Sequence, residues 1–341
     1  MNKTSDQYSP FLDWNPDDSV TVDSVAPALV SLASMLRDGY PFNTELVIAA
    51  STLLSSFNWR RHNSLTIDHL LKAIGQHFPD PAAVFVDSIT ILLSSPHPSI
   101  FREALPFIRR CLNYCYPSNR LALVSSKLLP GIISTPHLRD LSVIDNQGMM
   151  NDICVIFDRC VCLSSTDTVL YFSTTLDIDP QSIRNLVLHE VLIPFEPSLV
   201  QISRNPRFVS WDYEYQNASI FLIDIFDMSA YHQPTLDFVC SSRIPIVFQS
   251  LLSKVENIFP HRVIISSLAE NIRKWKEDGA ETADRGRILL QTLEREGFHE
   301  GIEQTLFHNK SSENGRFVRW YSFEIMNYLG MNSSEPEIDD P

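Results

Sequence analysis

Apolar residues recur along much of this chain at spacings of three and four, the spacing that turns one face of a helix toward a core. The first such stripe predicts a helix over Val22–Arg37. Its apolar members are Val25, Leu29, Leu32 and Leu36. Gly39 and Pro41 follow, and because glycine suits the left-handed position after a helix while proline cannot continue one, the helix is expected to end there. A second helix over Asn43–Phe57 then completes an antiparallel pair.

Apolar stripes separated by turns marked with proline or serine continue to the end of the chain. Further helices are predicted over Thr66–Phe78, Val84–Leu93, Ile100–Cys115, Ser118–Leu129, Leu138–Leu163, Asp179–Val191, Tyr213–Met228, Thr235–Ser241, Ile246–Phe259, Arg262–Lys276, Thr282–Glu296, Phe298–Phe307 and Phe317–Leu329. Gly148 is a candidate break within the longest of them. Pro194 and Pro197 are expected to stop the helix that starts at Asp179, because proline lacks the amide hydrogen that an interior position donates. The polar stretch Arg204–Asp212 is the longest expected loop.

A short phrase returns along the chain. Leu92-Leu93-Ser94-Ser95-Pro96-His97 comes back as Ile132-Ile133-Ser134-Thr135-Pro136-His137, so the two prolines and the two histidines lie about forty positions apart. Repeats of this period are typical of stacked helix pairs, because one pair cannot bury its own apolar face without a neighbour. His97 and His137 are therefore expected at the corners between helices.

The repeat, the helix pairing and the turns marked by proline resemble the armadillo and HEAT type of helical repeat protein. The resemblance covers roughly Val22 to Leu329, and the run Leu289–Glu303 resembles the last repeat of many such proteins. The chain also resembles a large set of uncharacterised protist paralogues, some attached to kinase-like domains. The resemblance implies an all-α fold, namely a right-handed α-solenoid of antiparallel helix pairs. It implies no activity.

Armadillo proteins that bind extended peptides carry a ladder of asparagines, accompanied by tryptophans in the nuclear-import adaptors. Asn113, Asn151 and Asn185 recur at roughly the repeat spacing. None of them has a tryptophan at a matching offset, so chance spacing is the favoured explanation. The expected organisation is a flexible acidic segment over 1–20, a single solenoid over 21–330 and a disordered acidic tail over 331–341.

Charge narrows the range of partners. The formal net charge is −14, which argues against a nucleic acid bound through its phosphates, since such binding needs a dense face of Lys and Arg. The longest apolar stretches, such as Ile220–Phe226, are broken by charge, so no membrane partner and a cytoplasmic location are expected. The six cysteines form no Cys-x-x-Cys pair, and we expect buried thiols that pack as small hydrophobes.

Motifs that carry chemistry are few. The chain has no Gly-x-Gly, no Gly-x-Ser-x-Gly and no His-Glu-x-x-His, which excludes the common phosphate-binding loops and the nucleophile elbow. Glu296 and His299 have the Glu-x-x-His spacing of helical di-metal sites, but such sites need the motif twice, and here it spans a glycine. His189-Glu190 lacks a spaced partner. No catalytic residue, metal or cofactor is therefore predicted.

Two clusters combine tryptophan with basic residues, the composition of hot spots in protein interfaces. The first consists of Trp59, Arg60 and Arg61, and the second consists of Arg273, Lys274 and Trp275. Both are candidate partner-binding sites. The alternative interpretation is an amphipathic tryptophan ring that lies half-buried at the end of a helix.

These observations favour a non-catalytic scaffold that binds a segment of a partner protein on its solenoid surface, because solenoids offer extended surface and no assembled chemistry is visible. A regulatory or adaptor subunit of a kinase, phosphatase or trafficking complex is the second hypothesis. A helical metal-dependent hydrolase, with residues that only folding brings together, is the third.

Overall fold

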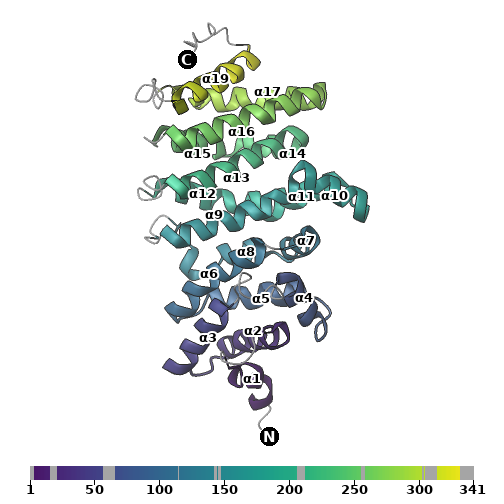
Figure 1. The fold of residues 1–341 in the computed structure, drawn as a ribbon, viewed down its shortest axis with the longest axis vertical. Coiled ribbons are helices and arrows are strands. Elements are labelled where there is room, and N and C mark those ends of the chain that lie inside the picture. The colour runs from purple at the N-terminus through teal and green to yellow at the C-terminus, as the bar shows by residue number, and fades with distance from the viewer. Residues whose placement is uncertain are drawn as a thin grey trace. The chain divides into compact units, whose positions relative to one another are not determined.

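The computed structural model describes residues 4–15, 21–56, 66–113, 115–141, 144, 147–205, 212–254, 258–301, 303 and 313–330. Every regular element within these ranges is helical, which confirms the all-α class (Figure 1). None of the described helices is both long and apolar enough to cross a bilayer. The handedness of a solenoid and the repeat period of about forty residues stay predictions.

Contacts between Cα atoms group the chain into two compact units, and the single solenoid expected over 21–330 stays a prediction. Unit 1 comprises Met1–Asp140 and Val155–Leu163, and unit 2 comprises Leu141–Cys154 and Ser164–Pro341. The division passes through helix α9 (Gln147–Val161).

The described part of unit 1 begins with nine helical elements. They are α1 (Thr4–Leu12), α2 (Val22–Arg37), α3 (Thr44–Ser56), α4 (Ile67–Gly75), α5 (Pro81–Leu93), α6 (Pro98–Asn113), α7 (Pro117–Ser125), α8 (Leu128–Ile133) and the 3₁₀ helix η1 (Pro136–Leu138). Helix α2 packs against α1, α4 and α5, and α6 packs against α3 and α5. The helix predicted over Val22–Arg37 is confirmed with the same bounds, and its stripe residues Val25, Leu29 and Leu32 are fully buried.

The two copies of the repeated phrase occupy equivalent places, since Ser94 caps the end of α5 and Ser134 caps the end of α8. One copy also contacts the other: Nε2 of His137 lies 2.9 Å from the carbonyl oxygen of Ser95. The two histidine rings lie against aromatic rings from earlier in the chain, with centroid distances of 5.3 Å for Phe42–His97 and 4.5 Å for Phe101–His137. Their prediction as corner residues is confirmed.

Unit 2 holds the first part of α9 and the remaining helices. These are α10 (Thr166–Leu176), α11 (Pro180–Val187), the π-helical turn η4 (Leu188–Leu192), α12 (Ile193–Arg204), α13 (Asp212–Tyr231), α14 (Gln233–Ser241), α15 (Ile244–Lys254), α16 (Ile258–Glu277), α17 (Ala280–Arg295) and α19 (Glu313–Tyr328). A short 3₁₀ helix η3 (Cys162–Ser164) precedes α10. Helix α13 packs against α14, α16 and α17, and α16 in turn packs against α19 (Figure 1).

Arginines from neighbouring helices bind main-chain oxygens at three helix ends. Arg110 donates to the Leu54 carbonyl oxygen near the end of α3 at 2.9 Å. Arg120 donates to the carbonyl oxygens of Leu112 in the last turn of α6 and of Cys115 just after α6, at 3.3 Å each. Arg285 donates to the Ala230 carbonyl oxygen at the end of α13, also at 3.3 Å. The last carbonyl groups of a helix have no partner within it, so these guanidinium groups satisfy acceptors and tie adjacent helices together.

Two further expectations concern the chain before α2 and the start of α9, and the flexibility expected of the segment 1–20 stays a prediction. The segment 1–20 contains α1, because Tyr8 and Phe11, three positions apart, bury their rings on one side of a short helix. Gly148 does not break a long helix, since α9 begins only at Gln147 and the glycine falls in its first turn.

Pro194 and Pro197 do not stop the helix that begins near Asp179. The chain passes from α11 through the π-helical turn η4 directly into α12, which contains both prolines in its first turns. An interior proline removes one hydrogen bond and clashes with the carbonyl four residues earlier. The wider hydrogen-bonding step of η4 relieves that clash, so the helix continues.

None of the six cysteines, all of which lie in the described part of the chain, forms a disulfide bond, and four of them are buried as expected: Cys111, Cys115, Cys154 and Cys160. Burial raises the pKa of the Cys115 and Cys160 thiols to about 12, which keeps both protonated. Cys162 and Cys240 are only half-buried, which corrects the expectation for these two.

Candidate functional site

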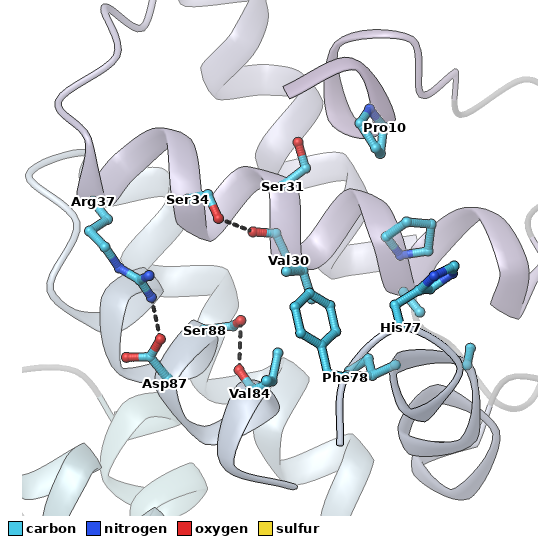
Figure 2. A pocket seen from close by; sticks show the side chains of 14 residues that line it. Pro10, Val30, Ser31, Ser34, Arg37, His77, Phe78, Val84, Asp87 and Ser88 are labelled. Carbon is cyan, nitrogen blue, oxygen red and sulfur yellow. Dashed lines mark hydrogen bonds and ion pairs between the residues drawn. The ribbon is translucent and has the colours of Figure 1, made fainter. Parts of the chain in front are cut away.

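A groove lies in unit 1 between α1, α2, α4 and α5, and has a volume of about 520 Å³ (Figure 2). We call it the α2 groove because α2 supplies six of its lining residues. These are Ala26, Pro27, Val30, Ser31, Ser34 and Arg37, whose spacings of one, three and four place them on one side of the helix. The facing residues are Pro10 of α1, Ala73 and Ile74 of α4, His77 and Phe78 of the turn after α4, and Val84, Asp87 and Ser88 of α5.

Helix α1 is held in place by side chains near its middle. Ser31 Oγ donates to the Tyr8 carbonyl oxygen at 3.0 Å, and the Tyr8 hydroxyl donates to Asp38 Oδ2 at 2.6 Å. The Tyr8 and Tyr40 rings meet edge to face with centroids 5.5 Å apart. This hydrogen bond to Asp38 is the main cause of the raised pKa of the Tyr8 phenol. These contacts position Pro10 at the rim of the groove.

The groove offers apolar surface rather than free hydroxyl donors. Ser34 Oγ donates to the Val30 carbonyl oxygen at 3.0 Å, and Ser88 Oγ donates to the Val84 carbonyl oxygen at 2.8 Å, both shown in Figure 2. Ser31 also donates to a carbonyl, as described above. With these hydroxyl hydrogens directed at the main chain, the surface left to a ligand is mostly apolar.

An ion pair between Arg37 and Asp87 lies at one side of the groove, and His77 lies at the other (Figure 2). Both members of the pair are more than half exposed, so the pair itself adds about 0–1 kcal/mol to stability. Arg37 also lines a second hollow of about 230 Å³, formed with Leu36 and with Ser94, Ser95 and Pro96 of the repeated phrase. The Arg37 side chain thus separates two adjoining hollows along α2 and α5.

The predicted partner-binding residues differ in whether the structure describes them and in how far they are exposed. Trp59, Arg60 and Arg61 lie outside the described residues. Lys274 is exposed, and Arg273 is half-exposed on α16. Trp275 has no exposed surface, so the expectation that it contacts a partner is corrected. Residues that are two positions apart in an α-helix lie about 200° apart around its axis. Arg273 therefore faces outward while the Trp275 ring points into the core.

The buried Trp275 ring has a polar partner. Its Nε1–H donates to Asp227 Oδ1 of α13 at 3.0 Å. Burial raises the pKa of the Asp227 carboxyl, and the hydrogen bond from Trp275 and the nearby Lys274 oppose the shift only in part. Desolvation of a charged carboxylate is unfavourable, so ionised Asp227 is a cost to folding.

We expect the Asp227→Asn variant to gain stability relative to the wild type as pH rises from about 4 to about 7. The pKa of the Asp227 carboxyl is higher in the folded than in the unfolded wild type. Above the folded-state pKa, the ionised carboxylate therefore lowers the free energy of unfolding by its full amount. Below the unfolded-state pKa, the carboxyl is protonated in both states and this loss disappears. Asparagine keeps an oxygen that accepts from Trp275. Urea unfolding across this pH range measures the difference, with the exposed Asp237→Asn as control. A stability difference that does not change with pH contradicts the prediction.

The remaining sequence candidates take part in local contacts. Gly297 has a φ of 86° just after α17, as expected of a glycine that ends a helix. His299 Nε2 lies 3.2 Å from Glu303 Oε1, and the His299 amide donates to Glu294 Oε2 at 3.3 Å. His189 is exposed on η4.

The α2 groove was missed by the sequence analysis. The only signal in the chain is the extra width of the apolar stripe of α2, in which Pro27 and Val30 lie beside the core positions but are not fully covered. No protein family, curated protein or solved structure was found to match this chain. The armadillo and HEAT relationship therefore stays a prediction.

Proposed function

We propose that this chain is a non-catalytic interaction protein that receives an apolar segment of a partner protein in the α2 groove. The observation that supports the proposal is the groove itself, an open hollow with apolar side chains and serine hydroxyls already bonded to the main chain. Concave, mostly apolar sites with a few polar groups at the edge are typical binding sites.

The size of the groove suits a short segment of protein. Its volume of about 520 Å³ is within the range of about 300–1,000 Å³ that is typical of binding sites. The adjoining hollow of about 230 Å³ extends the surface beyond Arg37 toward Pro96. A segment lying along α2 and α5 would place side chains in both hollows.

Charge favours basic residues on either side of the apolar segment. The chain has a net charge of −14, so a positively charged partner associates faster than a neutral one. Within the groove, Asp87 is half-exposed even while paired with Arg37, and its carboxylate accepts further hydrogen bonds. We therefore expect a partner segment with apolar residues at its centre and Lys or Arg at its ends.

Selection of a random peptide library against the purified full chain tests the proposal. We expect enrichment of peptides that combine apolar residues with Lys or Arg. The Val84→Asp variant should weaken their binding at least about tenfold. An apolar side chain that enters the groove would remove water from the introduced carboxylate, and this desolvation costs about 1.4 kcal/mol or more of binding free energy. Fluorescence anisotropy with a selected peptide measures the loss.

Ile48→Asp is the matched control, since it places the same charge at an apolar position of α3 that is 60% exposed and outside the groove. Circular dichroism of both variants establishes that each is folded. If no peptide is enriched, or if the enriched peptides bind Val84→Asp as tightly as Ile48→Asp, the α2 groove is not the binding site.

A further inference from the structure

A second surface with the composition of an interface lies in unit 2, where α16 meets α19. Two large aromatic side chains of α19 remain exposed there: Phe317 is 37% exposed and Trp320 is 42% exposed. Exposed tryptophan and phenylalanine side chains next to basic residues are enriched in the hot spots of protein interfaces. We call the surface formed by Arg273, Lys276, Arg316, Phe317 and Trp320 the α19 surface.

Cations from α16 lie over the aromatic rings of α19 along this surface. The Arg262 guanidinium lies 4.2 Å from the centre of the Phe317 ring, and the Arg273 guanidinium lies 5.5 Å from the centre of the Trp320 ring. Lys276 Nζ lies 4.7 Å from the centre of the Tyr328 ring. Such contacts restrict the rotamers of both partners.

Arg273 is itself held by a carboxylate of α19. Its Nε and a terminal nitrogen donate to the two Glu324 oxygens at 2.7 and 2.6 Å, a bidentate ion pair. The Trp320 ring therefore lies against a fixed guanidinium. A side chain that is already ordered loses less conformational entropy when a partner binds, so Trp320 is pre-organised as an anchor.

The two helices are locally basic in an acidic chain. Their cationic side chains are Arg262, Arg273, Lys274, Lys276, Arg316 and Arg319, and their carboxylates are Glu270, Glu277, Glu313 and Glu324. Lys274, Lys276 and Arg316 are exposed, and Arg316 precedes Trp320 by one helical turn. The two helices together therefore carry two more positive than negative side chains, whereas the chain as a whole is acidic.

We propose that the α19 surface binds an acidic segment of another protein, with an apolar or aromatic side chain of that segment packed on Trp320 and Phe317. Charge complementarity identifies the occupant, because carboxylates of the segment pair with Lys276 and Arg316 while the anchor covers the exposed rings. The site is independent of the α2 groove, which favours a segment of opposite charge. The chain would then connect two partners, one basic and one acidic.

A pair of synthetic peptides tests this assignment. The first peptide contains two leucines and a phenylalanine separated by glutamates. The second is the same peptide with lysines in place of the glutamates. Both carry fluorescein at the N-terminus. We expect the full chain to bind the glutamate peptide more tightly than the lysine peptide in fluorescence anisotropy. Trp320→Ala should weaken the binding about 30-fold, the change that corresponds to a hot-spot loss of about 2 kcal/mol.

Arg316→Glu should weaken the same complex and reduce its sensitivity to salt, because one screened ion pair is removed. Arg102→Glu, the same change at an exposed position of α6, is the matched control. Val84→Asp should leave this binding unchanged, which separates it from the α2 groove. Preference for the lysine peptide, equal binding of Trp320→Ala and wild type, or a dimer that dissociates on Trp320→Ala would each overturn the proposal.

Discussion

The Trp275→Ala variant is expected to lose about 3–5 kcal/mol of unfolding free energy, the range observed when a large buried aromatic side chain is truncated. Among the described residues, Trp275 is the largest side chain that is fully buried, and this residue of α16 contacts Asp227 of α13 and lies close to Gly286 of α17. The truncation also leaves Asp227 without its hydrogen-bond donor in a site where burial already disfavours its charge. Both effects act on the folded state.

Trp320→Ala is the control, because it removes the same side chain at a position that is 42% exposed. We expect a smaller loss there, about 1–2 kcal/mol, since a large part of the ring is already in contact with water in the folded protein and no buried group loses its hydrogen-bond partner. Urea unfolding followed by circular dichroism measures both variants. A similar loss for the two tryptophans would mean that Trp275 is not part of a close-packed core.

The Gly286→Ala variant should be destabilised by about 1–3 kcal/mol through overpacking. A methyl group built on Gly286 of α17 would lie 3.0 Å from Cζ3 and 3.1 Å from Cδ2 of Trp275, and closer still to Cε3. The ring is enclosed and cannot move aside. The expected loss runs against helix propensity, which favours alanine over glycine by about 1 kcal/mol.

A double-mutant cycle isolates the contact. In a Trp275→Leu background the obstructing ring is gone, so Gly286→Ala should become neutral or stabilising through its helix propensity. Thermal and urea unfolding of the four proteins gives the coupling energy between the two positions. If Gly286→Ala costs the same in both backgrounds, the glycine serves some purpose other than close approach to Trp275.

Arg273 shows what adjacency in the sequence can and cannot predict. Its position beside Trp275 and other basic residues predicted a binding site made of Arg273, Lys274 and Trp275. The structure pairs Arg273 with Trp320, about fifty residues later, across the contact between α16 and α19. Charge composition can be read locally, whereas the aromatic partner of a cation depends on which helices pack together.

The α2 groove illustrates the same limit. Apart from the extra width of the stripe of α2, the helices around the groove have ordinary apolar stripes, and that width alone does not indicate a hollow. The groove exists because α1 is held on α2 by Ser31 and Tyr8, leaving Val30, Phe78 and Val84 incompletely covered. A hollow is a property of several elements together, so hydrophobic periodicity cannot reveal it.

The sequence by itself determined the all-α class, most helix positions, the helix ends at Gly39 and Gly297, and the corner positions of His97 and His137. These features depend on periodicity and on the backbone preferences of glycine and proline, which act within a few residues. Tertiary structure alone decided which tryptophan is buried, where α1 lies on α2, and the passage of a helix through Pro194. The first two depend on side chains far apart in the chain that fill or leave space together, because close packing is a property of the assembled core. The passage through Pro194 depends on the π-helical turn η4 that precedes it.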